Sequence, residues 1–491
     1  MKRFPIIAVP IIALSLIVAS CSSDKNYSTP ATATTVMTIA AQGNPNAPNS
    51  DKGQALFKLI SSATRSIDIV IYEIGDDTLN NALVTAMKKG VYVRVVLDGY
   101  SGTVSTNEGF VTQIQEAMKS AGVDSKYFSA HWSSNNFNIT HQKSVMIDAV
   151  DASGALLSPM PSSAALLIST GNFSTYYPKA PATPELFYQA TDFYVTVADR
   201  TLITQATSVF NSDFSCAGST VNNTENGTQN AAGPLLWSNG SWATAMTGVS
   251  TWNVNNYPGY PAGYPYPMLD VSRMANQGNV TANQTILVNS AVKGDVIRIY
   301  NEEFASDTMN GKPTNPVFTA IVAAIGRGAD VRVVMSYSTN FTTDLTTIAE
   351  AGGTVYFIAP EQLLLAMNGY TGPTYVHAKA IMINGSNGIF KQGYVGSTNL
   401  ENSSLFENRE LGIAIGSANA DAARVITAQF DSDASWVGKS TASQIYGVAW
   451  TKGSEYTPPA WVSASSPTTT TTTTPQASQA NKACGAVILT K

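Results

Sequence analysis

The sequence carries one long pattern twice, and this duplication restricts its fold more than any other feature. His141 opens the run His-Gln-Lys-Ser-Val-Met-Ile-Asp, which ends at Asp148. His377 opens His-Ala-Lys-Ala-Ile-Met-Ile-Asn, which ends at Asn384. The chain has 491 residues and only three histidines, so two of the three stand in the repeated motif. An alternating strand produces one such motif by chance, but two copies in matching surroundings indicate a repeated functional unit.

The residues that follow the two motifs match in order and nearly in spacing. After the first motif come Ser-Thr-Gly-Asn-Phe-Ser at 169–174 and then Asp192 at the start of an apolar strand. After the second come Gly-Ser-Thr-Asn at 396–399 and then Glu410 at the start of another. The match extends far beyond one strand, which indicates duplication of a long unit rather than a short solenoid repeat.

The residues upstream of the motifs also repeat. Val-Arg-Val-Val occurs at 93–96 and again at 331–334. The first copy follows an Ile-Val-Ile-Tyr run that ends at Tyr72, and the second follows an Ile-Arg-Ile-Tyr run that ends at Tyr300. We interpret these two runs as counterparts, so both halves are expected to have the same order of strands and helices.

Strands and helices alternate along both halves, and this alternation predicts an α/β fold. We expect two similar lobes, each a mixed, largely parallel sheet flanked by helices. A pseudo-twofold axis would relate the lobes and place the active site between them. The expected helices lie near 51–64, 77–89, 108–121, 283–293 and 315–327, and the expected strands near 66–73, 91–98, 141–149, 164–170, 190–198, 295–301, 330–336, 377–384, 392–396 and 410–416.

The two motifs and the residues after them resemble the phospholipase D superfamily in its two-copy, single-chain form, over about residues 50–435. The second copy has the family residue at each position, namely His377, Lys379, Ser397, Asn399 and Glu410. The first copy agrees at His141, Lys143 and Asn172, but has Thr170 in place of serine and Asp192 in place of glutamate. Asn384 departs from the family aspartate, which Asp148 retains.

The resemblance implies displacement at a phosphodiester through a phosphohistidine. Such a displacement needs a nucleophile, a proton for the leaving alkoxide and positive charge around the phosphoryl oxygens. We expect His141 to attack phosphorus, and His377 to protonate the leaving oxygen and later to activate water. The expected phosphate ligands are Lys143, Lys379, Asn172, Asn399, Thr170 and Ser397. Asp192 and Glu410 are expected to orient the imidazoles, and Asp148 and Asn384 to support the motifs.

No cofactor or metal is expected at this site. The sequence has no clustered Cys/His spacing of the kind that binds zinc, and the two lysines supply positive charge in its place. The third histidine, His131, stands beside Trp132 in a polar stretch. We interpret it as a surface residue or as filler beside the substrate rather than as a catalytic group.

The substrate class stays open between lipid and nucleic acid. The formal net charge is −5 and only 12% of residues are charged, which argues against a broad basic nucleic-acid surface. A phospholipid substrate at a membrane surface is therefore favoured, with hydrolysis or transfer of the head group. The alternatives are an exported nuclease of the same superfamily and a surface lipoprotein without catalysis. Because both motifs are in one chain, we expect a monomer.

The N-terminus is typical of an export signal. Lys2 and Arg3 precede an apolar stretch at 5–18, which closes on Val-Ala-Ser before Cys21. This resembles a bacterial lipoprotein signal cut before Cys21, whose thiol would carry lipid. Ser22 is compatible with the outer membrane of a Gram-negative cell. The alternative is an ordinary secretory signal cut nearby.

The remaining segments complete the expected organisation. Residues 1–20 are the signal, 21–49 a flexible tether, 50–216 the first lobe, 217–282 an aromatic, Gly/Pro-rich connecting loop, 283–440 the second lobe, and 441–491 an extension with a threonine-rich tail. The loop aromatics either cover the site, contact a membrane or pack on the body. Cys216 and Cys484 remain after processing, and an oxidising compartment permits a disulfide between them.

The lipoprotein interpretation predicts where the protein is found. The wild-type protein should fractionate with membranes, and Cys21→Ser should release it into the soluble fraction because the lipid attachment site is lost. Wild-type protein found wholly in the soluble fraction would contradict lipidation and would leave the catalytic interpretation untouched.

Overall fold

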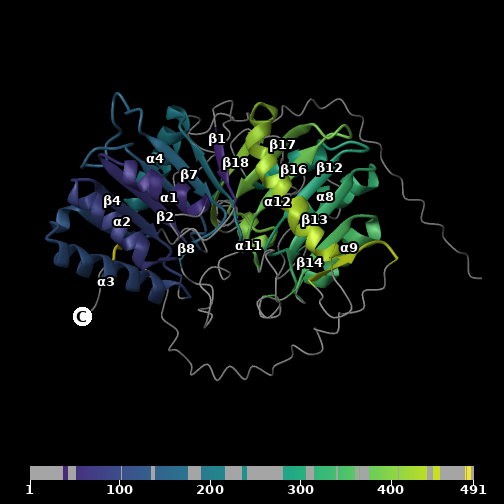
Figure 1. Cartoon of the computed structure of the whole chain (residues 1–491), viewed down its shortest axis with the longest axis horizontal. Helices are drawn as coiled ribbons and strands as arrows, with labels where there is room; N and C mark the ends of the chain where they lie inside the picture. The colour runs from purple at the N-terminus through teal and green to yellow at the C-terminus, as the bar shows by residue number, and fades with distance from the viewer. Residues whose placement is uncertain are drawn as a thin grey trace, which may run out of the picture.

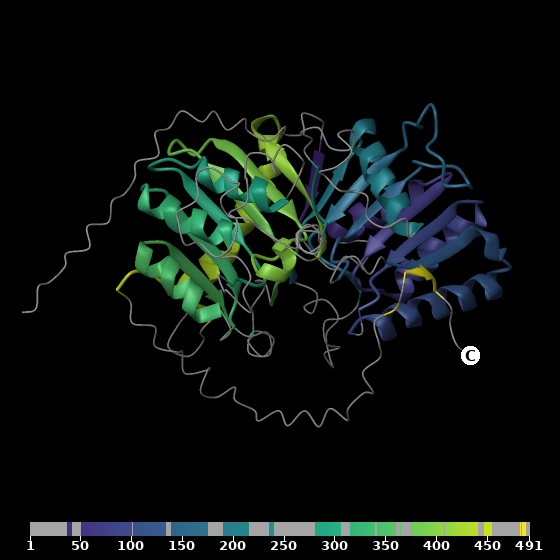
Figure 2. The same ribbon diagram turned by 180° about the vertical axis from the view of Figure 1, so that it is seen from behind.

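A computed structural model shows two lobes side by side, each built on one eight-stranded sheet (Figure 1). The purple and teal lobe of Figure 1 carries the first motif and the green lobe carries the second; Figure 2 gives the view from behind. The structure describes residues 37–41, 51–100, 102–133, 139–174, 190–215, 235–239, 280–305, 315–338, 341–359, 364, 375–406, 408–439, 446–453, 482 and 484–487.

The first sheet has the strand order β1-β10-β7-β6-β2-β4-β5-β20. Strands β2, β4 and β5 run parallel, and all other neighbours in this sheet are antiparallel. The strands are β1 (Met37–Ala40), β2 (Ser66–Ile71), β4 (Tyr92–Leu97), β5 (Phe128–Trp132), β6 (Ser144–Ile147), β7 (Ala165–Ser169), β10 (Tyr194–Val197) and β20 (Gly485–Ala486).

The second sheet has the strand order β11-β18-β17-β16-β12-β13-β14-β19. Strands β12, β13 and β14 run parallel, and the other neighbours are again antiparallel. The strands are β11 (Leu235–Asn239), β12 (Val296–Tyr300), β13 (Asp330–Ser336), β14 (Thr354–Ile358), β16 (Ala380–Asn384), β17 (Phe390–Gly396), β18 (Arg409–Gly416) and β19 (Gly447–Trp450).

Both sheets therefore share one topology, as the duplicated sequence predicts. The two mixed sheets flanked by helices are confirmed, whereas the expectation of largely parallel sheets is wrong. Within the two eight-stranded sheets, parallel pairing is confined to β2-β4-β5 and to β12-β13-β14, which are joined by helical crossovers. The motif strands β6 and β16 lead to β7 and β17 without a crossover helix, and such direct returns pair antiparallel. The pseudo-twofold axis stays a prediction.

The helices cover both faces of each sheet. They are α1 (Asp51–Ser62), α2 (Asp77–Lys88), α3 (Val104–Ala121) and α4 (Arg200–Phe214) in the first lobe, and α7 (Val280–Asn289), α8 (Pro316–Gly326), α9 (Thr342–Ala351), α11 (Asn402–Phe406) and α12 (Ala420–Gly438) in the second. Local signals set several boundaries. Asp76 caps α2 by accepting bonds from the backbone of Thr78 and Leu79, and Gly122 ends α3 with a φ of 67°.

One buried cluster joins the two lobes. It contains apolar side chains of α4 and α12 and the sheet faces that these helices cover, including Phe210 and Phe430. Tyr300 of the second lobe lies 5.5 Å from the ring of Phe193 in the first lobe and 5.1 Å from that of Phe430. Two further clusters lie under α1–α3 and under α7–α9. The strands between clusters are buried on both faces, and in β2 all six residues are buried, including Ser66 and Asp68.

Four edge strands lie in segments for which the sequence analysis predicted no strand. Strand β1 falls in the expected flexible tether, β11 in the expected connecting loop, and β19 and β20 in the expected C-terminal extension. Each pairs with a sheet edge, so the tether, the loop and the extension contribute strands that the sequence analysis did not predict. The strands are short and stand beside Pro, Gly and Thr-rich sequence, so periodicity alone does not reveal them.

Several sequence predictions fall outside the described residues. These are Cys21, Cys216, most of the threonine-rich tail, and every aromatic residue of the connecting loop except Trp237, which lies in β11. Cys484 is disulfide-bonded, and its Sγ lies 3.9 Å from the carbonyl oxygen of Asp213. Its pairing with Cys216 stays a prediction. In the described part of the chain, no helix is long and apolar enough to cross a membrane.

The last residues of the two motifs, Asp148 and Asn384, differ in how many hydrogen bonds they make and in how deeply they are buried. Asp148 is fully buried at a φ of 53°. Its carboxylate accepts bonds from the backbone of Thr64 and Arg65, both at 2.8 Å, and from Ser163 Oγ at 2.5 Å. Asn384 instead donates to the carbonyl of Gly388 at 3.1 Å in the exposed turn after β16. The second position therefore needs no buried acceptor, which explains why asparagine replaces aspartate there.

This difference predicts unequal losses of stability. Asp148→Ala leaves several part-buried donors without their acceptor and should lower the free energy of unfolding by about 3 kcal/mol. Asn384→Ala is the matched control and should cost about 1 kcal/mol or less. Urea unfolding of both variants measures the difference, and equal losses would contradict the structural role of Asp148.

Candidate active site

Each motif histidine stands at the point where its chain segment contacts the opposite lobe. The backbone N–H of His141 donates to the carbonyl of Arg409 in β18 at 2.9 Å. The N–H of His377 donates to the carbonyl of Thr191 at 3.2 Å, at the end of the parallel pairing of β15 (Tyr375–Val376) with β9 (Ala190–Thr191). In both cases the accepting residue directly precedes the acidic residue of the other lobe, so the two contacts are equivalent.

Each imidazole binds a carboxylate that the other lobe supplies. Nδ1 of His141 lies 3.1 Å from both carboxylate oxygens of Glu410, and Nδ1 of His377 lies 3.0 Å from Oδ1 of Asp192. All four side chains are buried. With Nδ1 held by a carboxylate, Nε2 is the atom left for substrate. The orienting roles expected for Asp192 and Glu410 fit this geometry.

Thr170 and Ser397 hold these carboxylates. Thr170 Oγ1 donates to Asp192 at 2.7 Å and accepts from the backbone of Phe193 at 2.9 Å. Ser397 Oγ donates to Glu410 and accepts from the backbone of Leu411 at 3.0 Å. Threonine replaces serine without loss because only the hydroxyl is used. The structure thus commits both hydroxyl protons to carboxylates, where the sequence interpretation placed them on phosphate.

The position of Asp192 explains why a glycine, Gly171, follows Thr170. A Cβ atom built at this residue would lie 2.4 Å from Oδ2 of Asp192, closer than any side chain tolerates. The second lobe has Thr398 at the corresponding place, opposite Glu410 rather than an aspartate. The glycine therefore makes room for the shorter acid of the first lobe.

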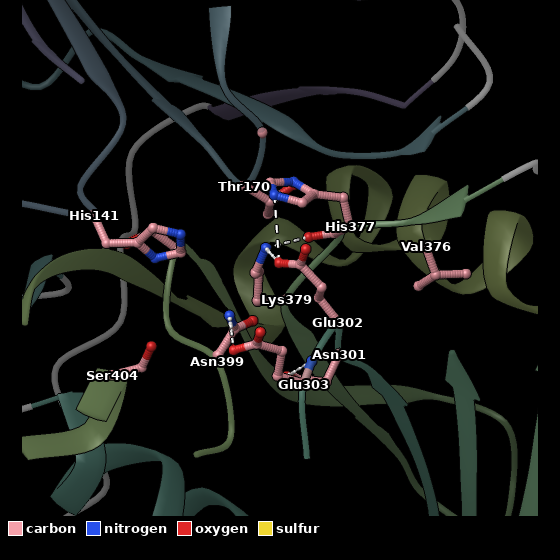
Figure 3. A network of polar contacts seen from close by, with 12 residues as sticks. His141, Thr170, Asn301, Glu302, Glu303, Val376, His377, Lys379, Asn399 and Ser404 are labelled. Carbon is pink, nitrogen blue, oxygen red and sulfur yellow. Dashed lines mark hydrogen bonds and ion pairs between the residues drawn. The ribbon is translucent and has the colours of Figure 1, made fainter. Parts of the chain in front are cut away.

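The two motif lysines are fully buried. Nζ of Lys143 and Nζ of Lys379 each donate at 2.6 Å to the carbonyl of the histidine two residues earlier. Burial, together with the charge of Lys379, lowers the pKa of Lys143 to about 7. Figure 3 shows the rings of His141 and His377 facing the space that holds Lys379 and Asn399.

The strand register corrects one pairing that the sequence suggested. Ile67 of β2 lies opposite Val93, and Ile297 of β12 lies opposite Val331, so Ile67 and Ile297 are counterparts. Counting along both strands makes Tyr300 the counterpart of a buried valine rather than of Tyr72. The runs both end in tyrosine, but hydrogen bonding to the neighbouring strands sets the register, and the two tyrosines differ by two positions.

The true counterpart of Tyr72 is Glu302, a residue that the sequence interpretation missed. The Glu302 carboxylate lies 2.7 Å from Nζ of Lys379 and 3.4 Å from Nε2 of His377, and it also accepts a bond from the hydroxyl of Tyr375. Burial alone would raise the pKa of Glu302, but the charges of His377 and Lys379 outweigh it and hold this pKa well below its usual range. The available signal was Asn-Glu-Glu directly after a strand.

Tyr72 gives the first half-site a different character. Its ring meets the ring of His141 edge to face at 5.2 Å and lies 5.4 Å from Nζ of Lys143. In the described part of the chain, no carboxylate lies within ion-pair distance of Lys143. Burial, with Lys143 nearby, lowers the pKa of His141 below 6.5 even though Glu410 opposes this shift.

The two motif asparagines, Asn172 and Asn399, each have a buried amide oxygen. Asn399 is buried and donates through Nδ2 to Glu303 at 3.0 Å, and its Oδ1 has no partner among the described residues. Burial, with the charges of Glu302 and Glu401 nearby, raises the pKa of Glu303 to about 7. Asn172 also leaves its Oδ1 without a partner in the described structure. The atom left without a partner in each side chain is therefore an acceptor oxygen rather than a donor.

Carboxylates on the covering helices fix the acid-bearing strands. Asp213 of α4 binds the buried guanidinium of Arg409 at 2.6 Å and 3.1 Å. The corresponding residue of α12, Asp433, accepts from Thr191 at 2.9 Å and from Tyr300 at 2.6 Å. Each residue that precedes an orienting acid is thus tied down by a carboxylate of the opposite lobe.

His131 lies away from this network. It stands in β5, with Nδ1 at 2.6 Å from the carbonyl oxygen of Phe214 and its ring stacked on that of Phe214 at 3.8 Å. The structure brings together the other two histidines with both motif lysines, both orienting acids and Asn399.

The site predicts a bell-shaped pH dependence. His141 must be neutral to attack, and its lowered pKa places the acid limb of kcat/KM below pH 6.5. Lys143 must be charged to hold a phosphoryl group, so kcat/KM should fall as pH rises through about 7. Lys143→Arg should move only the basic limb upward, because guanidinium stays charged. A basic limb that stays in place in this variant would contradict the role of Lys143.

Comparison with known families agrees with the geometry. Residues 56–214 and 288–434 match the family described as cardiolipin synthase, PLD-like domain. The two matched segments cover the two lobes and together more than half of the chain. A search of curated proteins finds no match.

A search of solved structures finds similar chains at low sequence identity. Phosphatidylserine synthase of Haemophilus influenzae Rd KW20 is 12% identical with a TM-score of 0.50, and the match covers 80% of this chain and 85% of that one. Nuc of Salmonella typhimurium, a phospholipase D family member, is 18% identical with a TM-score of 0.27, over 37% of this chain and 94% of that one. Polyphosphate kinase of Porphyromonas gingivalis is 10% identical with a TM-score of 0.42, over 77% of this chain, which spans 47% of that one. Two motifs, two matched segments and one shared fold together show that this chain belongs to the phospholipase D-like superfamily.

Proposed function

We propose that the protein hydrolyses or transfers the head group of phospholipids through a phosphohistidine formed on His141. One observation carries the proposal: two buried histidines from different lobes each bind a carboxylate through Nδ1, and their rings face the same space, which holds Lys379. This arrangement suits an in-line displacement, in which one imidazole attacks and the other protonates the leaving oxygen.

The surrounding residues supply the remaining requirements. Lys143 and Lys379 stabilise the negative charge that develops on the phosphoryl oxygens, and burial strengthens this effect. Asn172 and Asn399 donate amide hydrogen bonds to the same oxygens. The carboxylates of Asp192 and Glu410 keep Nδ1 protonated, so Nε2 of each ring is available for reaction.

The charges near the site favour a lipid over a nucleic acid. Besides Lys379, the charged groups that act on Lys143 in the described part of the chain are carboxylates, namely Glu410, Glu302 and Asp192. The other buried cations are committed elsewhere, since Lys52 donates to the carbonyl of Ala190 at 2.9 Å and Arg409 binds Asp213. A strand of nucleic acid brings several phosphates and would be repelled.

The proposed setting is a membrane surface. A lipidated Cys21 would hold the body beside its substrate, in the cell envelope of a bacterium. The protein would act as a monomer, because one chain supplies both motifs. The family relation leaves the substrate open, and an exported nuclease is the alternative that the assay below separates.

A side-by-side assay in EDTA tests the proposal. The purified protein should release head groups from phospholipid vesicles and should release no nucleotides from single-stranded DNA. His141→Ala and His377→Ala should each lower the rate at least about a hundredfold, because each removes an essential proton or electron-pair donor. His131→Gln is the matched control and should stay within about threefold of wild type.

Each other outcome has a defined meaning. A site variant that keeps more than about a tenth of the wild-type rate would contradict the two-histidine mechanism. Nucleotide release without head-group release would favour the nuclease. Activity that is lost in EDTA and restored by Mg²⁺ or Zn²⁺ would contradict metal independence. Inactivity on both substrates would favour a surface lipoprotein without catalysis.

A further inference from the structure

The two half-sites differ most at one pair of equivalent positions. Tyr72 follows β2 and Glu302 follows β12 at the same place in the register. Both side chains reach the histidine and the lysine of their own lobe, but one presents an aromatic ring and the other a carboxylate. The remaining groups are nearly symmetric, so this pair is where the chemistry of the two imidazoles diverges.

His377 is faced by carboxylates on both ring nitrogens. Asp192 lies 3.0 Å from Nδ1 and Glu302 lies 3.4 Å from Nε2. The other titratable groups around this ring are Lys379, which is held by Glu302 at 2.7 Å, and Tyr375, whose hydroxyl donates to the same carboxylate. A carboxylate beside each nitrogen is satisfied in full only when both nitrogens carry a proton.

His141 is faced by a carboxylate on one nitrogen only. Glu410 binds Nδ1 at 3.1 Å, and the edge of the ring meets Tyr72. The nearby cations Lys143 and Lys379 both oppose a second proton on this ring. A neutral imidazole with Nδ1–H toward Glu410 and a lone pair on Nε2 fits these surroundings.

At its distance from His377, Glu302 can favour the protonated ring without binding the proton that the ring must donate. At 3.4 Å the carboxylate favours the charged ring, but this separation is longer than an aligned N–H···O bond. The Nε2–H is therefore not consumed by Glu302 and can turn to a leaving oxygen. Lys379 and Tyr375 hold the carboxylate in this position.

We propose that Glu302 is a positioning residue that keeps His377 protonated on both nitrogens, and that the tyrosine at the equivalent position leaves His141 neutral. The difference between a glutamate in one lobe and a tyrosine in the other thus makes one of two nearly equivalent histidines an acid and the other a nucleophile. This inference rests on the proposed phosphodiester chemistry.

The reaction then balances at each step. The Nε2 lone pair of His141 attacks phosphorus and forms the N–P bond while the bond from phosphorus to the leaving oxygen breaks. The Nε2 proton of His377 passes to that oxygen, which departs as an alcohol. His377 next takes a proton from water or from an acceptor alcohol as its oxygen attacks phosphorus. The N–P bond breaks, His141 regains its lone pair, and His377 is again doubly protonated.

Nitrogen NMR of the full chain with labelled histidine tests the charge states without turnover, and the three rings are assigned with single His→Gln variants. At pH 7.5 His377 should give an imidazolium signal and His141 a neutral one. Glu302→Gln should convert His377 to a neutral ring and leave His141 unchanged. Tyr72→Glu should convert His141 to imidazolium. A neutral His377 in the wild type, or a His377 signal unaffected by Glu302→Gln, would overturn the proposal.

Leaving groups give a second readout that a structural defect would not mimic. A p-nitrophenolate leaving group departs without a proton from an acid, whereas an alkoxide leaving group needs one. Glu302→Gln should therefore lower the ratio of alkyl to aryl rates at least tenfold. Glu303→Gln removes the neighbouring carboxylate, which does not contact His377, and should change this ratio less than twofold. Equal ratios in both variants would contradict the role of Glu302.

The two hypotheses fail in different ways. If the wild type turns over neither ester nor vesicles, the proposed function is wrong, whatever the histidine spectra report. If the wild type is active but its His377 is neutral, the assignment to Glu302 is wrong and the phosphodiesterase proposal stands.

Discussion

The exchange of carboxylates between the lobes is the constraint on which the site depends. Neither lobe holds a complete half-site, because each histidine is oriented by an acid of the other lobe. The strands that carry these acids are in turn fixed by the carboxylates of Asp213 and Asp433 on the covering helices. A shared apolar core under α4 and α12 makes this exchange rigid. The geometry of the site therefore depends on how the two lobes pack against each other.

Duplication supplies symmetry, and small substitutions remove it where the chemistry requires. Threonine for serine and aspartate for glutamate keep the same contacts at altered lengths, with Gly171 making room for the shorter acid. Asparagine for aspartate at position 384 is tolerated because that end of the motif is exposed. Among the described residues, only the exchange of tyrosine for glutamate after the first parallel strand of each lobe changes a charge beside an imidazole, and it is there that the two halves acquire different properties.

The sequence predicted the lobes, most central strands and the motif residues, because scarce histidines in a repeated context are a strong signal. It did not reveal the edge strands β1, β11, β19 and β20, which lie in segments whose composition suggests loops. It also aligned Tyr72 with Tyr300, because hydrogen-bond register is not visible in a run of apolar residues. That error concealed Glu302. The buried supports Asp213 and Asp433 escaped notice too, since they act across the lobes and follow no local pattern.

Trapping the covalent intermediate tests the central claim most directly. In the His377→Gln variant, His141 should still attack an aryl phosphodiester, whose leaving group needs no proton, but the variant should lack the base that hydrolyses the adduct. Rapid quenching followed by peptide mapping should find about one phosphoryl group per chain, attached to His141, together with a burst of aryl alcohol. An adduct on any other residue, or release of the alcohol with no adduct at all, would contradict the two-histidine mechanism.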